Sequence, residues 1–239
     1  MKTVYWSPWQ SPKSYAETFL SYADPVKLIE DISPNINPNN TLDNFYKCPA
    51  FVNSIKNTYL FKSPTNCDVT LNEGHIINNL DNTVAYDPNV LQLKQPSMYN
   101  SYTVSMNVNW IFFSEESLEI ESMHPYMHET SVSEHGYYVP GSYDISSWFR
   151  PLEYAFQLKP LHNRFCVSQD EPLLYIKFKT NEPVRLKKFR LTEELFRYST
   201  SCIRLKMYRR DRNLRNLYGI FHRTKLRDMV LTEIKKNLL

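Results

Sequence analysis

The stretch YTVSMNVNWIFF, residues 102–113, decides the fold class of this chain. Apolar and polar residues alternate along it, so an extended chain would place each kind on its own side. The apolar side would carry Val104, Met106, Val108, Trp110 and Phe112, and the polar side Thr103, Ser105, Asn107 and Asn109. Because successive side chains of a strand point to opposite faces of a sheet, the pattern predicts a half-buried strand. The turn sequence SEES (114–117) and a return strand with Leu118 and Ile120 inward would complete a hairpin.

Further strand-like segments lie on both sides of this hairpin. They are CDVTL (67–71), HIINNL (75–80), TVAY (83–86), EYAFQL (153–158), NRFCVS (163–168), LLYIKFKT (173–180) and VRLKKF (184–189). Turn signals rather than helices separate these segments, which is typical of antiparallel sheets. We therefore predict a mainly β protein, an antiparallel jelly-roll or cupin-like sandwich.

The first 65 or so residues are dense in proline, asparagine and aromatic residues. Proline removes a backbone donor and favours extended neighbours, so we expect an extended arm with short helices at most. Helical patches are expected at 12–28 and 49–59, and Trp6 and Trp9 would anchor the arm to the rest of the molecule.

The C-terminal part has helical spacing, with two amphipathic stretches that are out of phase. The first carries Leu214, Leu217, Tyr218 and Phe221, and the second Leu226, Met229, Val230 and Ile234. This predicts two helices, or one with a break near residues 222–224. We divide the chain into an arm (1–65), a β-sandwich body (66–192) and a basic helical segment (193–239).

Composition excludes several classes of protein. With 239 residues and 42% hydrophobic residues, the chain is long enough for one domain with a sizeable core. No apolar run approaches the ~18 residues that cross a bilayer, so we expect neither a transmembrane segment nor a signal peptide. The four glycines (74, 136, 141 and 219) assemble no phosphate-binding or dinucleotide-binding motif. The four cysteines form no C-x-x-C pair, so neither a zinc module nor a disulfide framework is expected.

Three of the six histidines lie in HPYMHETSVSEHG (124–136), which suggests a cupin-type site for one divalent transition metal. The candidate ligands are His124, His128, Glu129 and His135. On a strand the first two histidines would lie ~13 Å apart, too far to share an ion at ~2.1 Å. A helical turn that begins at Pro125 would bring them together. Without it, these are loop or core histidines and no cofactor is expected.

The segment VPGSYDISSWFRPLEYAF (139–156) is dense in residues with special properties. Pro140–Gly141 suits a type II turn, and Asp144 and Arg150 suit a charge-assisted pair over large aromatic anchors. The segment is either a structural corner or a loop that faces a ligand or partner. In the second case the contacting residues would be Tyr143, Asp144, Trp148 and Arg150.

Charge is concentrated at the C-terminus. Residues 185–239 hold 16 basic and 5 acidic residues, a net charge of +11, which leaves −8 on residues 1–184 and +3 overall. Arginines neutralise phosphates and interleaved aromatics stack on bases, so the tail is a candidate nucleic-acid site. Its candidate residues are Arg209, Arg210, Arg212, Arg215, Arg223, Lys225 and Arg227. Alternatively, the apolar helix faces pack on the β body or on another subunit and leave the arginines as a solvated rim.

Three segments resemble a family of uncharacterised tailed-phage proteins, especially marine and cyanobacterial ones, with bacterial relatives. They are KCPAFVNSIKNTYLFKSPTNCDV (47–69), VPGSYDISSWFRPLEYAF (139–156) and DEPLLYIKFKTNEPVRLKKF (170–189), and the resemblance covers roughly residues 45–195. It implies a phage-type origin, location in host cytoplasm or virion, and a β-rich fold. It implies no activity.

Three functions follow as hypotheses. The first is a non-enzymatic phage-type protein that serves assembly or partner binding, as a homo-oligomer or with another phage or host protein. The second is a metal-dependent cupin-like enzyme that uses the histidine cluster. The third is an accessory protein that binds nucleic acid through the basic tail; a membrane partner is not expected.

Overall fold

The computed structural model describes residues 1–11, 20–35, 47–72, 75–80, 91–94, 101–208 and 213–239. Its helices are α1 (Leu28–Ile32), α2 (Pro49–Ile55), α3 (Ser131–His135), α4 (Glu193–Tyr208), α5 (Leu214–Arg223) and α6 (Leu226–Lys236). Its strands are β1 (Lys2–Trp9), β2 (Val26–Lys27), β3 (Thr58–Lys62), β4 (Cys67–Asn72), β5 (His75–Asn78), β6 (Leu91–Lys94), β7 (Thr103–Met106), β8 (Asn109–Ser114), β9 (Glu119–Met123), β10 (Gly136–Tyr138), β11 (Gly141–Asp144), β12 (Tyr154–Leu158), β13 (Arg164–Val167), β14 (Pro172–Phe178) and β15 (Val184–Lys188).

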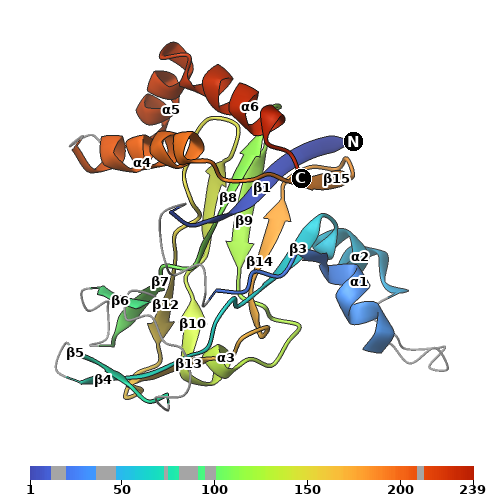
Figure 1. The fold of residues 1–239 in the computed structure, drawn as a ribbon. Coiled ribbons are helices and arrows are strands. Elements are labelled where there is room, and N and C mark those ends of the chain that lie inside the picture. The colour runs from blue at the N-terminus through green and yellow to red at the C-terminus, as the bar shows by residue number, and fades with distance from the viewer. Residues whose placement is uncertain (12–19, 36–46, 73–74, 81–90, 95–100, 209–212) are drawn as a thin grey trace.

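The protein is mainly β, with several antiparallel sheets and C-terminal helices, as the sequence predicts (Figure 1). The sheets have the strand orders β15-β1-β8, β10-β12-β7-β6, β11-β9-β14-β3-β2 and β13-β4-β5. Every pair between these strands is antiparallel except β1 with β15, which runs parallel. The predicted segments at 67–71, 75–80, 153–158, 163–168, 173–180 and 184–189 are all strands, whereas 83–86 lies outside the described residues.

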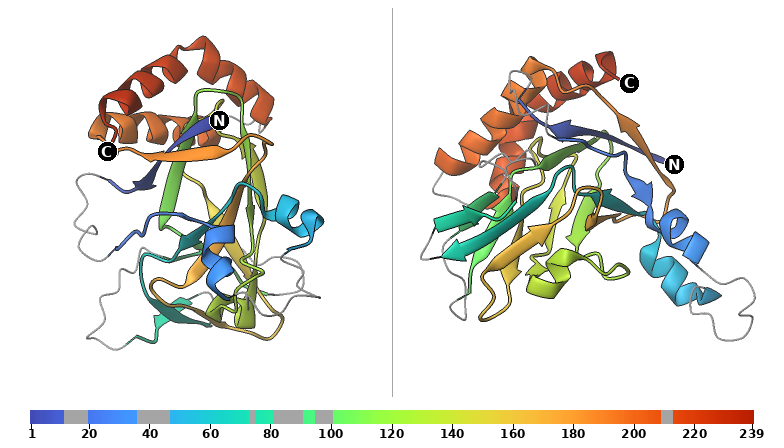
Figure 2. Two further views of the ribbon diagram at one scale, coloured as in Figure 1. Left: turned by 90° about the vertical axis from the view of Figure 1, so that its right-hand side faces the viewer. Right: turned by 60° about the horizontal axis from the view of Figure 1, so that its bottom comes forward.

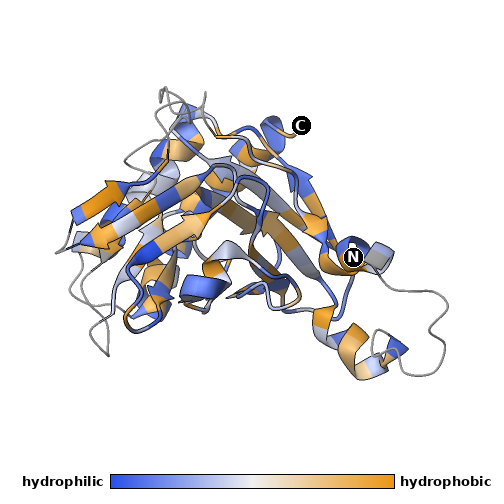
Figure 3. Cartoon of the chain, turned by 90° about the horizontal axis from the view of Figure 1, so that it is seen from below, coloured by the Kyte–Doolittle hydropathy of each residue, from blue (hydrophilic) through white to orange (hydrophobic). Residues whose placement is uncertain are grey.

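The five apolar residues of the deciding stretch all lie in one core, as the alternation predicts. This main core also takes side chains from β1, β3, β4, β9, β12, β13 and β14, so the sheets surround it. Strand colours in Figure 3 alternate between hydrophobic and hydrophilic along several strands, which reflects one inward and one outward face. Burial of this apolar face is the main source of stability for the sheets.

The stretch is not one half-buried strand, however. It splits at Asn107 and Val108 into β7 and β8, which belong to different sheets. Strand β8 is buried on both faces, because Ile111 and Phe113 enter a second core beneath the C-terminal helices. The predicted hairpin is wrong: β8 pairs with β1, while the return strand β9 pairs with β11 and β14.

The first residues of the chain form a strand in the middle of a sheet. β1 is extended, as expected, and lies between β15 and β8. Trp6 is buried in the main core, and Trp9 stacks on Phe196 of α4 at 5.0 Å and donates its indole N–H to Ser199 Oγ at 2.8 Å. Both tryptophans therefore anchor this segment, one to the sheets and one to the helices.

Helices α4, α5 and α6 cover the outer face of the β15-β1-β8 sheet (Figures 1 and 2). The predicted break between the two amphipathic stretches lies at residues 224–225, where Lys225 adopts a left-handed conformation with φ of 56°. Leu217 and Phe221 of α5 and Val230 and Ile234 of α6 all point into the second core. The apolar faces of α5 and α6 thus both point towards the second core, because the chain turns between the two helices.

The other expectations for local structure have mixed outcomes. Helix α2 begins at Pro49 as expected but ends at Ile55, and Tyr59 belongs to β3. Of the patch at 12–28, residues 12–19 lie outside the described residues, and the rest is not the expected helix: 20–25 have no regular structure, 26–27 form β2, and only Leu28 begins α1. Gly141 begins β11 and lacks the positive φ that a type II turn requires. No helix in the described ranges is both long and apolar enough to cross a bilayer.

Candidate ligand-binding cleft

A cleft of about 990 Å³ lies between the helical layer and the β body. One wall is formed by α4 and α5 and the other by β7, β12 and the segment 139–155. Figure 1 labels α4, β7 and β12. The end of β1 and the start of β8 close it where Trp9 and Asn109 are paired. Its volume falls in the range of small-molecule sites, which is roughly 300–1,000 Å³.

The segment that the sequence singles out as a ligand or partner loop forms part of this cleft. Tyr143, Trp148 and Arg150 line it, and Trp148 is buried against Tyr218 and Phe221 of α5. Asp144 has a different role from the one expected. Its carboxylate accepts hydrogen bonds from the backbone N–H of Ser146 and from the hydroxyls of Ser146 and Ser147, at 2.6–2.7 Å.

The predicted Asp144–Arg150 pair does not form. The carboxylate of Asp144 is occupied by the two serines, and Arg150 Nη1 lies 3.8 Å from Glu153 Oε2. The Asp144 backbone N–H donates to the Tyr218 hydroxyl at 3.3 Å, which ties this corner to α5. Asp144 is therefore a structural residue of the corner, whereas Arg150 faces the cleft.

Arg150 combines burial with few partners. Its side chain is 16% exposed, and its guanidinium lies over the Tyr143 ring at 5.8 Å from the centroid. It donates no hydrogen bond to any described residue, and its ion pair with Glu153 is too long for one. Since a guanidinium carries five N–H donors, this one has unused hydrogen-bonding capacity beside the cleft.

Other polar groups at the cleft also lack partners within the described part of the chain. They are Gln10 Nε2, Asn109 Oδ1 and the Tyr143 hydroxyl, all buried. Leaving a buried polar atom unpaired costs about 1–3 kcal/mol, so three at one cleft favour a binding role. Burial raises the pKa of the Tyr143 phenol well above its usual value, so this hydroxyl stays protonated.

The charges of the cleft come from both walls. Glu153 Oε2 lies 3.8 Å from Arg150 Nη1 and 3.8 Å from Lys206 Nζ of α4. These are the charged residues of the described lining, which therefore carries a net charge of +1. The described lining contains no histidine, cysteine or aspartate.

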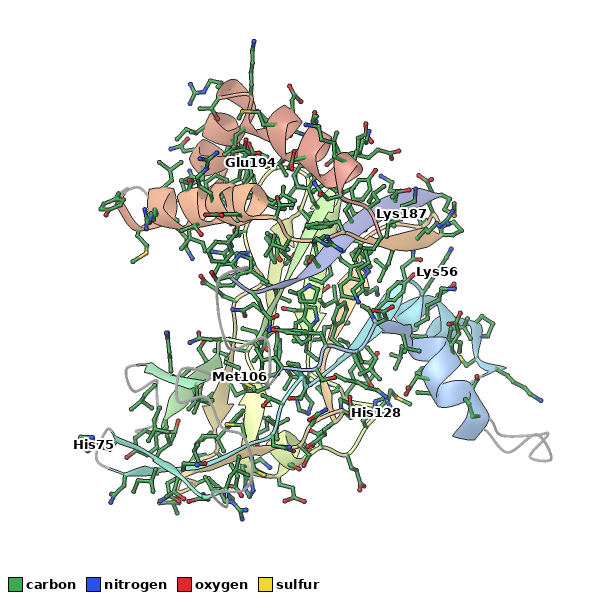
Figure 4. All side chains as sticks on the ribbon, in the orientation of Figure 1. Lys56, His75, Met106, His128, Lys187 and Glu194 are labelled. Carbon is green, nitrogen blue, oxygen red and sulfur yellow. The ribbon has the colours of Figure 1, made fainter. Side chains whose placement is uncertain are left out.

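The candidate metal ligands lie on another part of the body. His128 is held by both ring nitrogens: Nε2 lies 2.8 Å from Asp31 Oδ2 of α1, and Nδ1 lies 2.5 Å from the Tyr175 hydroxyl. Figure 4 shows His128 on the side of the body next to α1. The Tyr175 hydroxyl also accepts the Met127 N–H. Because an ionised carboxylate only accepts, Nε2–H donates to Asp31. These bonds connect α1 to the body.

The other predicted ligands do not join His128 in one group. His135 lies at the end of α3, with its ring 5.7 Å from that of His162. Burial lowers the pKa of His124, and Lys159 adds to the effect. No group of three or more histidine, cysteine, aspartate or glutamate residues suited to a metal ion occurs among the described residues, Glu129 included. The metal site remains a prediction.

The basic residues of the tail divide into two sets. Arg209, Arg210 and Arg212 lie outside the described residues. Arg215, Arg223 and Lys225 are exposed on the helical layer, while Arg227 donates to the carbonyls of Ser146 and Glu115 on the body. The apolar faces of α5 and α6 are already covered by the sheet, so the basic residues form a solvated outer face.

Sequence reasoning missed the groups that other segments bring to the cleft. Gln10, Asn109 and Lys206 come from β1, β8 and α4, or from residues next to them, and only the strand order brings them together. No protein-family model, curated protein or solved structure matches the chain.

Proposed function

We propose that this chain is a non-enzymatic binding protein that captures its ligand in the cleft between the β body and α4–α5. The observation that carries the proposal is the gathering of unpaired polar groups at one cleft of ligand size. Arg150 and Tyr143 come from the segment 139–155, and Asn109 from the start of β8. Polar groups of this kind, set among aromatic rings, fix the orientation of a bound molecule.

The proposal retains the tailed-phage origin and the jelly-roll or cupin-like architecture as predictions. The antiparallel sheets around one core support the architecture, and the parallel β1–β15 pair is an addition to it. Assembly as a homo-oligomer also stays a prediction. Light scattering tests it; most apolar residues of α5 and α6 pack on their own sheet, whereas Leu214 and Met229 are 44% and 47% exposed.

A second candidate function rests on the outer face of the helical layer. Arg215, Arg223 and Lys225 are exposed there, and Tyr208 at the end of α4 is 84% exposed. Nucleic acid bound there would show an affinity that falls steeply with salt and falls further when the three basic residues are replaced by glutamine. An affinity for single-stranded DNA that is unchanged by these replacements would exclude this face.

The cleft is tested by titrating the isotope-labelled full chain with a chemically diverse fragment library and recording amide NMR shifts. Val139 lines the cleft and is 43% exposed, so Val139→Trp would put a bulky ring into the space beside residues 139–155. Val52 on α2 is 40% exposed and lies outside the cleft, so Val52→Trp is the matched control.

We expect fragments to shift the amides of residues 139–155, and Val139→Trp to abolish this while Val52→Trp does not. Shifts that lie elsewhere, or that persist in Val139→Trp, would contradict the proposal. So would a library in which no fragment binds.

A further inference from the structure

We propose that the ligand of this cleft is a small organic acid with one carboxylate and an apolar body, and that Arg150 binds the carboxylate. The inference rests on the proposed function and names its ligand class. It starts from the Arg150 side chain, which is 84% buried and yet donates no hydrogen bond to any described residue. An arginine fork matches the two oxygens of a carboxylate, so such a ligand would use donors that the protein leaves idle.

The position of Arg150 is fixed before any ligand arrives. Its guanidinium lies over the Tyr143 ring, and its neighbour Trp148 is 2% exposed and packed against α5. A side chain that is already ordered loses little conformational entropy when it binds. The ring beneath this guanidinium carries the Tyr143 hydroxyl, which is buried and has no partner among the described residues.

The charge balance favours a monoanion. Arg150 Nη1 and Lys206 Nζ each lie 3.8 Å from Glu153 Oε2. A ligand carboxylate would neutralise the net charge of +1 on the described lining, whereas a phosphate dianion would make that lining negative. Glu153 is 49% exposed and can turn towards solvent as the ligand enters.

The rest of the lining suits an apolar body. Aromatic rings line both walls, and they are Trp9, Tyr143, Trp148, Tyr154, Phe196 and Tyr218. Ile203, Met207 and Leu214 extend this surface along α4 and α5. Burying an apolar group against them contributes about 25 cal/mol per Å², which a fully polar acid would not gain.

The test is calorimetric titration of the full chain with phenylacetate and octanoate. Phenylacetamide is the uncharged analogue of phenylacetate, and phenyl phosphate is an aromatic dianion for comparison with the two monoanions. A pentapeptide with a free C-terminal carboxylate represents a protein ligand. Arg150→Gln removes the charge and keeps an amide donor, and Arg150→Lys keeps the charge and loses the fork. Arg215→Gln, an exposed arginine of α5 outside the cleft, is the matched control.

We expect saturable binding of at least one acid, with the amide about 10- to 100-fold weaker, since a hydrogen bond to a charged group contributes about 1.5–3 kcal/mol. Arg150→Gln should lose a similar factor, Arg150→Lys an intermediate one, and Arg215→Gln none. If Arg150→Gln fails to fold, Tyr143→Phe supplies the test and should weaken binding several-fold.

Equal affinity for acid and amide would overturn the assignment, as would tighter binding of phenyl phosphate or of the peptide. Absence of binding by both acids would also overturn it. The fragment titration then tests the proposed binding function separately. Fragments of another chemistry that bind in the cleft would support the binding function and exclude only the organic acid. If no fragment binds in the cleft, both the binding function and the organic acid are refuted.

Discussion

Replacing Phe113 with alanine should destabilise the protein strongly, because this side chain joins the sheet to the helical layer. Phe113 is 0% exposed and meets Phe149 edge-on at 5.7 Å and Phe221 of α5 at 6.2 Å. A strand buried on one face only would expose this residue. The cost of Phe113→Ala therefore measures whether α5 and α6 really cover the sheet.

The magnitude follows from the packing. Truncation of a fully buried phenylalanine to alanine costs about 3–5 kcal/mol, through lost transfer free energy and the cavity left behind. Tyr208, which is 84% exposed, is the control, and Tyr208→Ala should change the free energy of unfolding by less than about 0.5 kcal/mol. The free energy of unfolding of a native protein is typically about 5–15 kcal/mol, so two alanine truncations in one chain would remove most of it. The double-mutant cycle therefore uses the milder variants Phe113→Leu and Phe221→Leu.

The assay is urea unfolding followed by circular dichroism and tryptophan fluorescence, with Trp148 only 5.9 Å from Phe221 as a reporter within the helical layer. The cycle should give a coupling energy of about 0.5–1.5 kcal/mol between the two rings. A cost below about 1 kcal/mol for Phe113→Ala, together with additive effects of the leucine variants, would refute the packing of the helices on β8.

Three further predictions concern other contacts. Asp31→Ala should destabilise the protein by about 1–2 kcal/mol in urea unfolding, because it leaves the ring N–H of His128 without its partner; a change below about 0.5 kcal/mol would contradict the bond. The Arg164 guanidinium holds the pKa of Asp68 below its usual value, so Asp68 stabilises the fold above about pH 4 and this is lost as the pH falls through the lowered pKa. Asp68→Asn should therefore melt at a lower temperature than the wild type at pH 7, and the difference in melting temperature should narrow towards pH 2. A difference that stays constant with pH would contradict the stabilising role of the Asp68 carboxylate. Lys225→Gly should raise the free energy of unfolding by about 0.5–1 kcal/mol, since φ of 56° strains a side chain but not glycine, and a loss of stability would count against that geometry.

The fold was predictable where local patterns decide it. Alternation along residues 104–112 assigns five side chains to the main core correctly, and the phase change near Phe221 locates two C-terminal helices. The run WIFF breaks the alternation, and this break marks the second buried face of β8. The partner of β8 was not predictable, because β1 lies about a hundred residues away and no local pattern records that pairing.

The cleft was predictable only in part. Tyr143, Trp148 and Arg150 lie in a segment whose composition is itself unusual, so the sequence points to them. Asn109 and Lys206 have ordinary surroundings in the sequence and reach the cleft only because of the sheet order and the docking of α4. Histidine spacing suggested chemistry at 124–136, but the bonds of His128 to Asp31 and Tyr175 depend on residues about fifty or more positions away.

The most direct test of the central claim is a crystal structure of the protein grown with phenylacetate. The account predicts electron density for the acid in the cleft, with its carboxylate about 2.7–2.9 Å from the Arg150 guanidinium nitrogens and its ring against the aromatic lining. Phenylacetate bound elsewhere, or in the cleft with its carboxylate turned away from Arg150, would contradict it.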